Sequence, residues 1–148
     1  MEKEKKKIRK GIAAIVFLKE KGKTKFLLLK RKMNWNGWEW IKGGSKKGES
    51  FVQTLKRELK EEIGIKNNYK LKTTPYSHFF LYQKSFIKDK KGYQGANDKI
   101  YLVQLFNSKI EVDKKEHSGH AWFSKKEAME KITWPDQKKI FQIATRKL

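Results

Sequence analysis

Cysteine is absent from this chain of 148 residues, and proline occurs only twice. Without thiols the protein can form no disulfide and has no cysteine nucleophile. No apolar run approaches the roughly 20 residues that span a bilayer. The charged segment before the longest apolar run, residues 11–18, lacks the length and the cleavage site of a signal peptide. We therefore expect a cytoplasmic protein with no membrane partner.

Acidic residues are scarce as well, because Lys and Arg number 37 against 16 Asp and Glu, a formal net charge of +21. A surface this basic attracts polyanions such as nucleotides, RNA 5′ ends and acidic lipid headgroups. The lysines are spread along the whole chain and form no single block. The charge therefore has two explanations that composition leaves open: RNA binding, or a proteome that is generally rich in lysine.

Four glutamates, Glu49, Glu58, Glu61 and Glu62, lie in one otherwise lysine-rich segment, residues 43–65, which reads GGSKKGESFVQTLKRELKEEIGI. Ser50 is a good helix N-cap, and Gln53 three residues later completes a capping box. Gly64 lies where a left-handed residue is expected to end the helix. A buried stripe is predicted by four apolar residues at helical spacing: Val52, Leu55, Leu59 and Ile63.

Three carboxylates, those of Glu58, Glu61 and Glu62, crowd one edge of this predicted helix within an arc of roughly 100°. The edge is about a quarter turn from the apolar stripe, so we expect it to lie close to the core but open to solvent. Like charges at this spacing destabilise a bare helix. Mg²⁺ would relieve the repulsion, since it prefers oxygen ligands and often binds one or two carboxylates plus substrate phosphates. A charged solvent face is the alternative for the three acids taken alone.

The rest of the chain predicts a mixed β-sheet covered on two faces, because helices and strands interleave without strict alternation. Residues 11–18 and 25–31 form a predicted hairpin. Further strands are predicted at residues 77–86, 99–106 and 121–123, with a polar loop at 88–98. Ser124 and Glu127 form a second capping box that opens a helix, and a final helix runs from about Asp136 to Lys147. Residues 1–10 form a charged arm, which we expect to be mobile.

The acidic segment resembles the Nudix box at every defined position. The matching positions are Gly43, Glu49, the run Arg57-Glu58-Leu59, the pair Glu61-Glu62, and the pair Gly64-Ile65. The chain is thus similar to the Nudix hydrolases. The resemblance implies one domain, residues 1–148, with the α/β/α sandwich and mixed sheet of that family. It also implies metal-dependent hydrolysis of a nucleoside diphosphate linked to a further group.

The same resemblance implies a role for each acid of the box. Glu61 and Glu62 would bind the metal, Mg²⁺ or Mn²⁺. Glu58 would be either a further ligand or the base that takes a proton from the attacking water. Arg57 would orient these carboxylates by ion pairing, and Glu49 would reach the metals from outside, often through water.

Two further ligands are expected outside the box helix. One is the backbone carbonyl of Lys42, just before the box glycine. The other is Glu116, which precedes a Trp-containing run, where many Nudix enzymes carry an acid that closes the metal site; Glu111 is the competing candidate. Because Mg²⁺ prefers oxygen, His117 and His120 are interpreted as polar loop residues.

Aromatic residues precede the box at Trp35, Trp38 and Trp40. Trp rings stack on nucleobases; the alternative is that alternating rings lie in the core and at the surface. We favour that alternative for Trp35 and Trp40, which leaves Trp38 as the candidate substrate-binding ring. His78 is expected to be a strand histidine with a hydrogen-bond partner.

Three partial matches resemble the asymmetrical dinucleoside tetraphosphate hydrolases and the bacterial RNA 5′-pyrophosphohydrolases. WEWIKGG is similar to their W-x-x-P-K-G, with Ile41 in place of the proline. Gly95 and Lys99 are similar to a G-x-x-x-K stretch, without the usual glutamines between them, and EHSGHAW is similar to E-H-x-x-x-x-W. The resemblance implies that Lys42 and Lys99 hold the polyphosphate; simple solubility is the alternative for each lysine.

We therefore expect hydrolysis of a phosphoanhydride bond, first of all asymmetrical cleavage of a dinucleoside polyphosphate such as diadenosine tetraphosphate. Removal of pyrophosphate from an RNA 5′-triphosphate is the second expectation, and house-cleaning hydrolysis of nucleoside triphosphates is the third. A non-catalytic, basic RNA- or nucleotide-binding module is the alternative of another class. Inactive Nudix domains usually lose acids from the E-x-x-E-E set, whereas this chain retains them all.

Overall fold

Strands dominate the computed structural model, which describes residues 7–33, 35–83 and 92–148. Its elements in chain order are β1 (Ile8–Glu20), β2 (Lys23–Arg31), β3 (Gly37–Glu39), β4 (Ile41–Gly44), α1 (Phe51–Ile63), β5 (Tyr69–Leu81), β6 (Gly95–Leu105), β7 (His117–Phe123), α2 (Lys125–Lys131) and α3 (Pro135–Ala144). Within these described ranges, no helix has the length and apolar character needed to cross a membrane.

The strands form one mixed sheet in the order β3-β2-β1-β6-β5, with β4 also paired to β1 and β7 to β2. β1 and β6 run parallel at its centre, whereas the other pairs are antiparallel. β1 and β2 form the predicted hairpin. Its turn residues Lys21 and Gly22 both have positive φ, 50° and 75°, as a tight two-residue hairpin turn requires.

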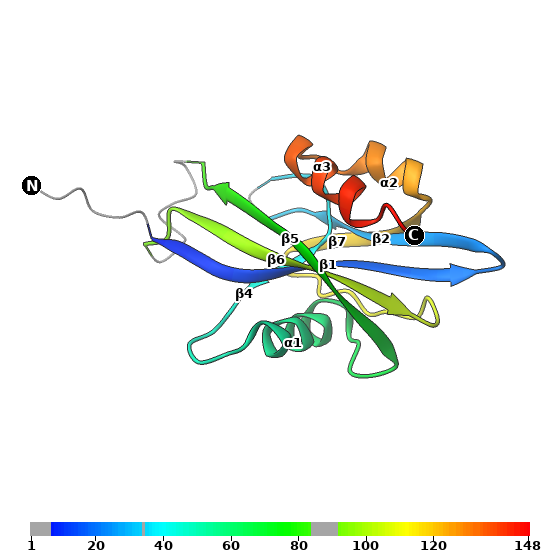
Figure 1. The fold of residues 1–148 in the computed structure, drawn as a ribbon, viewed down its shortest axis with the longest axis horizontal. Helices are drawn as coiled ribbons and strands as arrows, with labels where there is room; N and C mark the ends of the chain where they lie inside the picture. The colour runs from blue at the N-terminus through cyan, green and yellow to red at the C-terminus, as the bar shows by residue number, and fades with distance from the viewer. Residues whose placement is uncertain (1–6, 34, 84–91) are drawn as a thin grey trace, which may run out of the picture.

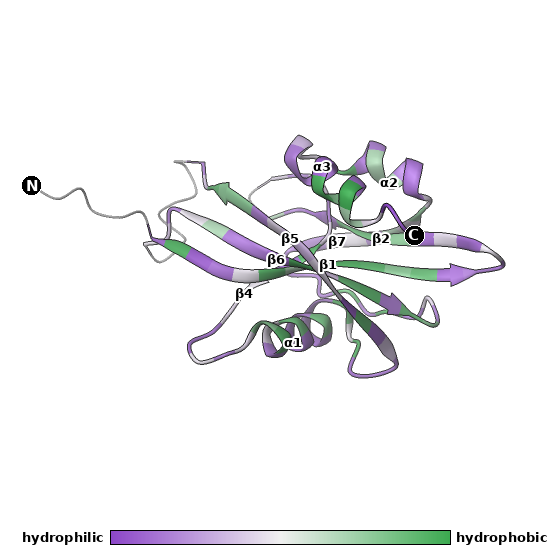
Figure 2. Ribbon diagram, in the orientation of Figure 1, coloured by the Kyte–Doolittle hydropathy of each residue, from purple (hydrophilic) through white to green (hydrophobic). Residues whose placement is uncertain are grey.

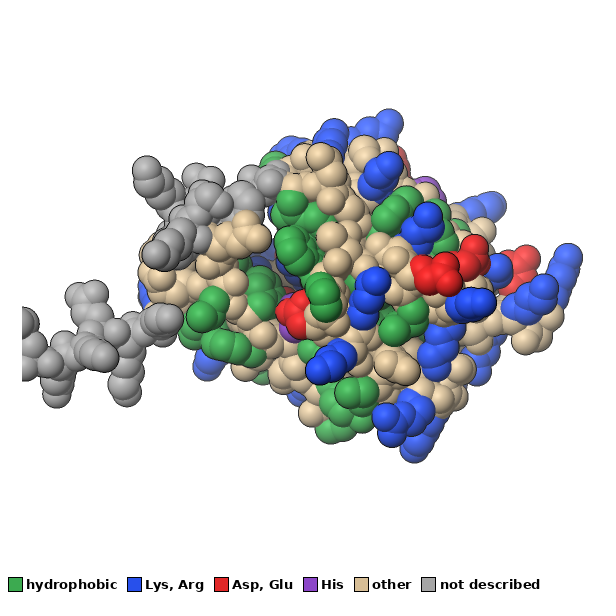
Figure 3. Space-filling view, turned by 90° about the horizontal axis from the view of Figure 1, so that it is seen from above, with side chains coloured by type: hydrophobic (Ala, Val, Ile, Leu, Met, Phe, Trp, Pro, Cys, Tyr) green, Lys and Arg blue, Asp and Glu red, His purple; other side chains and the backbone are tan. Residues whose placement is uncertain are grey.

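Helices cover both faces of this sheet, which confirms the predicted α/β/α arrangement. Figure 1 shows α1 on one side of the strands and α2 with α3 on the other. The hydrophobic segments concentrate in the strand centres and on the inner sides of the helices (Figure 2). On the face that carries α2 and α3, lysine and arginine side chains are scattered over the surface and form no single block (Figure 3).

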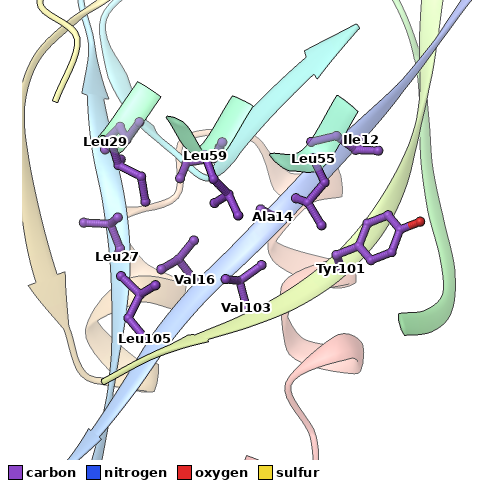
Figure 4. Close-up of a cluster of buried hydrophobic side chains, with 12 residues drawn as sticks. Ile12, Ala14, Val16, Leu27, Leu29, Leu55, Leu59, Tyr101, Val103 and Leu105 are labelled. Atoms are coloured by element: carbon purple, nitrogen blue, oxygen red, sulfur yellow. The ribbon is translucent and has the colours of Figure 1, made fainter. Parts of the chain in front are cut away.

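Two clusters of buried side chains join the helices to the sheet. The cluster under α1 includes Leu29, Leu55, Leu59 and Val103 (Figure 4). The cluster under α2 and α3 includes Phe26, Ile100, Phe141 and Trp40, which is a core residue as predicted.

The box helix α1 forms as its local signals predict. Ser50 accepts a hydrogen bond from the Gln53 backbone, and the Gln53 side chain accepts one from the Ser50 backbone. Gly64 ends the helix at φ 69°. The prediction that Val52 is buried was wrong, because its side chain is 40% exposed. The first turn docks instead through Thr54, whose hydroxyl lies 2.7 Å from that of Ser45.

Several strand boundaries also differ from the predictions. β5 begins at Tyr69 instead of residue 77, and β6 begins at Gly95, inside the predicted polar loop 88–98. β7 begins at His117 and not at residue 121. α3 ends at Ala144, earlier than predicted. Polar side chains concealed the starts of these strands, because backbone pairing between β5 and β6, and between β7 and β2, extends them beyond their apolar centres.

The charged arm is partly ordered. Residues 8–10, which were assigned to the arm, belong to β1 and pair with β6. Lys7 precedes the strand, and residues 1–6 of the arm lie outside the described residues, as do residues 84–91 of the predicted strand and loop.

The burial difference along α1 gives a stability test. We expect Leu59→Ala to lower the free energy of unfolding by about 2–5 kcal/mol, because it leaves a cavity in the core. Val52→Ala, a truncation on the same helix at an exposed position, should change it by less than about 1 kcal/mol. Urea unfolding followed by circular dichroism measures both. A loss for Val52→Ala comparable to that of Leu59→Ala would contradict the burial pattern.

Candidate active site

A cavity of about 500 Å³ opens between the acidic edge of α1 and the N-terminal end of α3. Figure 3 shows acidic and histidine side chains next to hydrophobic ones at a hollow on the α3 side of the molecule. The lining combines three kinds of group, carboxylates, cations and aromatic rings, among them Glu58, Glu61, Glu62, Glu116, Arg9, Arg31, Lys42, Trp35, Phe80 and Trp134.

Arg57 holds together three of the predicted acids. Its guanidinium nitrogens lie 2.8 Å from Glu49 Oε2, 2.8 Å from Glu58 Oε1 and 3.2 Å from Glu61 Oε2. A fourth bond of 2.8 Å runs to the carbonyl oxygen of Gly44, which ties α1 to β4. Hydrogen bonds donated by Arg57 lower the pKa of Glu49 to about 2. The structure thus brings Arg57 to the carboxylates in the way that the ion-pairing prediction requires.

Glu58 is buried, with only 6% of its surface exposed, although the predicted helix edge was open to solvent. Its carboxylate packs against Gly43, where any Cβ would overlap it. Burial raises the pKa of Glu58 to about 7; the nearby charges of Glu62 and Glu61 add to the shift, and Arg57 opposes it. Crowded carboxylates with a raised pKa are what a divalent cation would relieve.

A buried chain of charged groups joins the sheet to α1, and sequence reasoning missed it. Glu39 of β3, 1% exposed, accepts a hydrogen bond from Arg31 at 3.1 Å and lies 3.1 Å from His117 Nε2. His117 Nδ1 lies 3.4 Å from Glu62 Oε2. The interpretation of His117 as a loop residue was wrong, because β7 buries it to 3% exposure. The available signal was the similarity of EHSGHAW to E-H-x-x-x-x-W, in which His117 is the fixed histidine.

These contacts set the charge of the histidine. Burial alone would lower the pKa of His117, but the hydrogen bond to Glu39 and the charge of Glu62 nearby raise it to about 9. Burial would raise the pKa of Glu39, and the contacts with His117, Lys42 and Arg31 lower it overall. Glu62 Oε2 is buried, and although it lies 3.4 Å from His117 Nδ1, it makes no hydrogen bond among the described residues. A carboxylate oxygen without a hydrogen bond, in a cluster of carboxylates, fits a divalent cation.

Glu116 closes this group from outside the helix. Oxygen and nitrogen atoms of Glu62, Glu116 and His117 lie within 4.8 Å of one another. The backbone carbonyl of Glu116 accepts a hydrogen bond of 2.8 Å from Lys32, which fixes the turn before β7. The competing candidate Glu111 is exposed beyond the C-terminal end of α1 and is not part of the cavity lining. The geometry therefore favours Glu116.

The other end of the cavity is aromatic. The rings of Trp35 and Trp134 meet edge to face at 5.2 Å, and the ring of His78 stacks on Phe80 at 4.8 Å. His78 is a buried strand residue with a partner, as predicted, since its Nε2 lies 2.6 Å from Asp136 Oδ2. Trp35, which was interpreted as a structural ring, is thus part of the cavity wall together with Trp134.

Two predicted substrate-binding residues are not part of the cavity lining. Trp38 packs against Phe123 at 5.2 Å on the α2 side, because strand alternation turns it away from its neighbour Glu39. Lys99 Nζ lies over the rings of Phe51 and Tyr101, at 5.7 and 5.5 Å. His120 is exposed.

Three of the cations that line the cavity, Arg9, Arg31 and Lys42, come from β1, β2 and β4, and a fourth, Lys115, precedes β7. Lys42, predicted as a phosphate-binding residue, lies there with its Nζ 4.9 Å from the Phe80 ring. Arg9, which was assigned to the mobile arm, lines the cavity as well and donates a hydrogen bond of 3.1 Å to the buried Asp98. Burial raises the pKa of Asp98 to about 6, with Arg9 opposing.

The fold is that of a known class of enzymes. The family model of the NUDIX domain matches residues 8–142, and the chain belongs to this family. It is a Nudix hydrolase, an enzyme that acts on phosphorus-containing acid anhydrides. Enzymes of this family generally use a divalent metal ion.

Two RNA pyrophosphohydrolases are similar to this chain over most of its length. The chain is 36% identical over 115 residues to an RNA pyrophosphohydrolase of a Nitratiruptor species, covering 76% of this chain and 74% of that one. An RNA pyrophosphohydrolase of Campylobacter jejuni is 35% identical over 106 residues, covering 71% of this chain and 67% of that one.

Solved structures share the fold. A C. elegans Ap4A hydrolase in a binary complex has a TM-score of 0.77 at 22% identity and covers 94% of this chain and 96% of its own. The E. coli dihydroneopterin triphosphate pyrophosphohydrolase has a TM-score of 0.78 at 17% identity, with 93% and 97% covered. At these identities the likeness concerns the fold alone.

The raised pKa of Glu58 predicts that Glu58→Gln stabilises the metal-free protein at pH 8, by on the order of 1 kcal/mol. Folding favours the protonated form of Glu58. The protonated side chain therefore contributes fully to the stability of the fold below the unfolded pKa of 4.5, and this contribution is lost as the pH rises through about 7. Glutamine mimics the protonated form at every pH. The advantage should therefore shrink at pH 5.

Urea unfolding in EDTA at pH 5 and pH 8 measures this difference. Glu111→Gln removes the same charge at an exposed position outside the cavity and should stay within about 0.5 kcal/mol of the parent at both values. A Glu58→Gln variant that is less stable than the parent at pH 8 would show that the Arg57 ion pair outweighs burial.

Proposed function

We propose that residues 1–148 act as one domain that removes pyrophosphate from the triphosphorylated 5′ end of RNA. The observation that carries the proposal is a single cavity that joins the carboxylates of α1 to the aromatic rings beside α3. Such a cavity can hold the phosphates and the base of one nucleotide together. Relatives that match most of the chain are RNA pyrophosphohydrolases, which supports RNA among the nucleotide substrates.

Glu58, Glu61, Glu62 and Glu116 would hold the divalent ion, Mg²⁺ or Mn²⁺, with Glu49 and the Lys42 carbonyl as outer or further ligands. When bound, the ion supplies neutralisation of phosphate charge and positioning of the attacking water. Arg57 keeps three of the carboxylates in place through its ion pairs.

Two roles are considered for Glu58, that of a metal ligand and that of the general base. Its burial and its pKa near 7 support the role of base, because a base works best when its pKa lies close to the working pH. Its contact with Arg57 at 2.8 Å and its packing on Gly43 fix the carboxylate in one orientation.

The phosphates would contact the cations of the cavity wall. Arg9 and Lys42 line the cavity next to Gly43 and Gly44. Asp98 orients Arg9 by a hydrogen bond, so that the guanidinium is held at the cavity instead of in solvent. The net charge of +21 would steer an RNA polyanion toward this site at low salt.

The 5′-terminal base would lie at the aromatic end. Trp35 and Trp134 offer ring faces there, and Gln137 lies at the cavity with a buried side-chain oxygen that has no partner among the described residues. Stacking on such rings tolerates any base. We therefore assign base stacking to Trp134 and Trp35, and not to Trp38.

A second candidate is asymmetrical cleavage of a dinucleoside polyphosphate, our first expectation from sequence. The similarity of the Trp38–Gly43 stretch to those hydrolases supports it, and Lys42 lines the cavity as that similarity implies. The partial matches are shared with the RNA pyrophosphohydrolases and do not separate the two candidates. The relatives that match most of the chain are RNA pyrophosphohydrolases, so RNA ranks first and the dinucleoside second.

A substrate panel with product identification separates the candidates. We expect 5′-triphosphorylated RNA to be converted to 5′-monophosphorylated RNA with a higher kcat/KM than diadenosine tetraphosphate or free nucleoside triphosphates. Faster release of ATP and AMP from diadenosine tetraphosphate would favour the dinucleoside. Tight RNA binding without turnover of any substrate would favour the non-catalytic module.

Glu62→Gln should lower kcat by two or more orders of magnitude, because it removes a metal ligand. The folded structure should persist, since the side chain lies at the helix edge and keeps its size. Single-turnover assays at saturating Mg²⁺ measure the loss, with Glu111→Gln as the matched control. Activity within a few-fold of the parent would contradict the metal assignment.

Trp134→Leu should raise KM for the RNA substrate roughly five- to 150-fold, because base stacking contributes about 1–3 kcal/mol. Trp38→Leu makes the same change outside the cavity and should alter KM less than about twofold. Thermal unfolding checks that both variants fold. A larger effect of Trp38→Leu than of Trp134→Leu on KM would restore Trp38 as the substrate-binding ring.

A further inference from the structure

We propose that His117, anchored by Glu39, is a positioning residue that holds Glu62 in the orientation needed for metal binding. The inference rests on the proposed function only in that Glu62 is a metal ligand. His117 presents one ring nitrogen to each of two carboxylates, Nε2 to Glu39 at 3.1 Å and Nδ1 to Glu62 at 3.4 Å. The imidazole thus connects the sheet to the acidic edge of α1.

The need for such a residue follows from the contacts of Arg57. Among the described residues, its guanidinium contacts the carboxylates of Glu49, Glu58 and Glu61 but not that of Glu62. Glu62 is therefore the one acid of the box that lacks this support. An unsupported glutamate loses conformational freedom when it binds a metal, and this loss weakens binding. His117 is the residue placed to limit that freedom.

The anchor of His117 is rigid. Glu39 is buried in β3, and the same oxygen that contacts His117 lies 3.1 Å from Arg31 Nη1. Arg31 is fixed in turn by a bond of 2.9 Å from its Nε to the carbonyl oxygen of Met33. β7 pairs with β2 so that His117 is opposite Arg31. Glu39, which contacts Nε2 of the imidazole, and Arg31, which holds Glu39, therefore both belong to strands of the sheet.

Outer partners of this kind orient metal ligands, and their loss typically lowers metal affinity by roughly 10–100-fold. A purely structural role for the same buried pair would predict a different outcome, namely lower stability without a specific loss of metal binding. The two roles can be separated because the two ring nitrogens have different partners.

Two amide variants of His117 test the contacts of its two ring nitrogens separately. The amide nitrogen of His117→Asn replaces Nδ1 and keeps a donor toward Glu62. The amide nitrogen of His117→Gln replaces Nε2 and keeps only the contact to Glu39. Titration of the purified full chain with Mn²⁺, followed by the electron paramagnetic resonance signal of free Mn²⁺, gives the affinity without substrate.

We expect His117→Gln to weaken Mn²⁺ binding roughly 10–100-fold and His117→Asn by less than about threefold. His120→Gln, on the exposed side of the same strand, is the matched control and should match the parent. In a Glu62→Gln background, His117→Gln should cause no further loss. Thermal unfolding in EDTA reports stability independently.

Parent-like Mn²⁺ affinity of His117→Gln would overturn the proposal, and so would equal losses in both variants that follow their loss of stability. Nitrogen coupling from a directly coordinated imidazole would also overturn it, since His117 would then be a ligand. If His117→Gln does not fold, Glu39→Gln tests the anchor: a several-fold loss of affinity supports the proposal, and an unchanged affinity overturns it.

These outcomes are distinct from a failure of the proposed function. A protein that does not hydrolyse RNA can still bind Mn²⁺ through Glu62 and respond to His117→Gln. Unchanged Mn²⁺ affinity in Glu62→Gln itself would remove the metal site, and the positioning role with it.

Discussion

Repulsion among carboxylates is the constraint on which the rest of the structure depends. Glu58, Glu61 and Glu62 share one edge of α1, and burial of Glu58 makes their mutual repulsion more costly. Arg57 offsets part of this repulsion and ties the helix to β4 through the Gly44 carbonyl. The helix remains folded because its capping box and its core residues stabilise it independently of the charges.

Strand alternation distributes the functional groups between the two faces of the sheet. Glu39 and Ile41 lie on the α1 face, the first in the charged chain with His117 and the second in the core. Trp40 and Lys42 belong to the opposite face, where Trp40 packs under α3 and Lys42 lines the cavity. A short stretch of backbone thus supplies a carboxylate anchor, two core residues and a cation. The cavity lies where the groups of both faces meet.

The predictions from sequence were reliable where the signal was local. Caps, helical spacing and turn residues fixed α1 and the β1–β2 hairpin, because these features depend on neighbours a few residues away. Val52 failed because its burial depends on how the first turn docks. His117, Glu39 and Arg9 escaped prediction because their partners lie far away in the chain, and Trp38 was preferred to Trp35 for want of any signal of strand register. The pairing of strands that are distant in the chain determines these positions, and the pattern of a single sequence does not show which strands pair.

The basic composition and the acidic site fit together physically. A cluster of carboxylates alone would repel a polyphosphate, whereas a protein with a net charge of +21 attracts it over distances comparable to the screening length. The long-range field and the local site thus have opposite signs. Cations at the cavity wall, Arg9 and Lys42 among them, compensate part of the local negative charge, and a bound divalent ion would compensate the remainder. In the proposed function, the lysine-rich surface would therefore favour arrival of the substrate, and the acids would determine where its phosphates are hydrolysed.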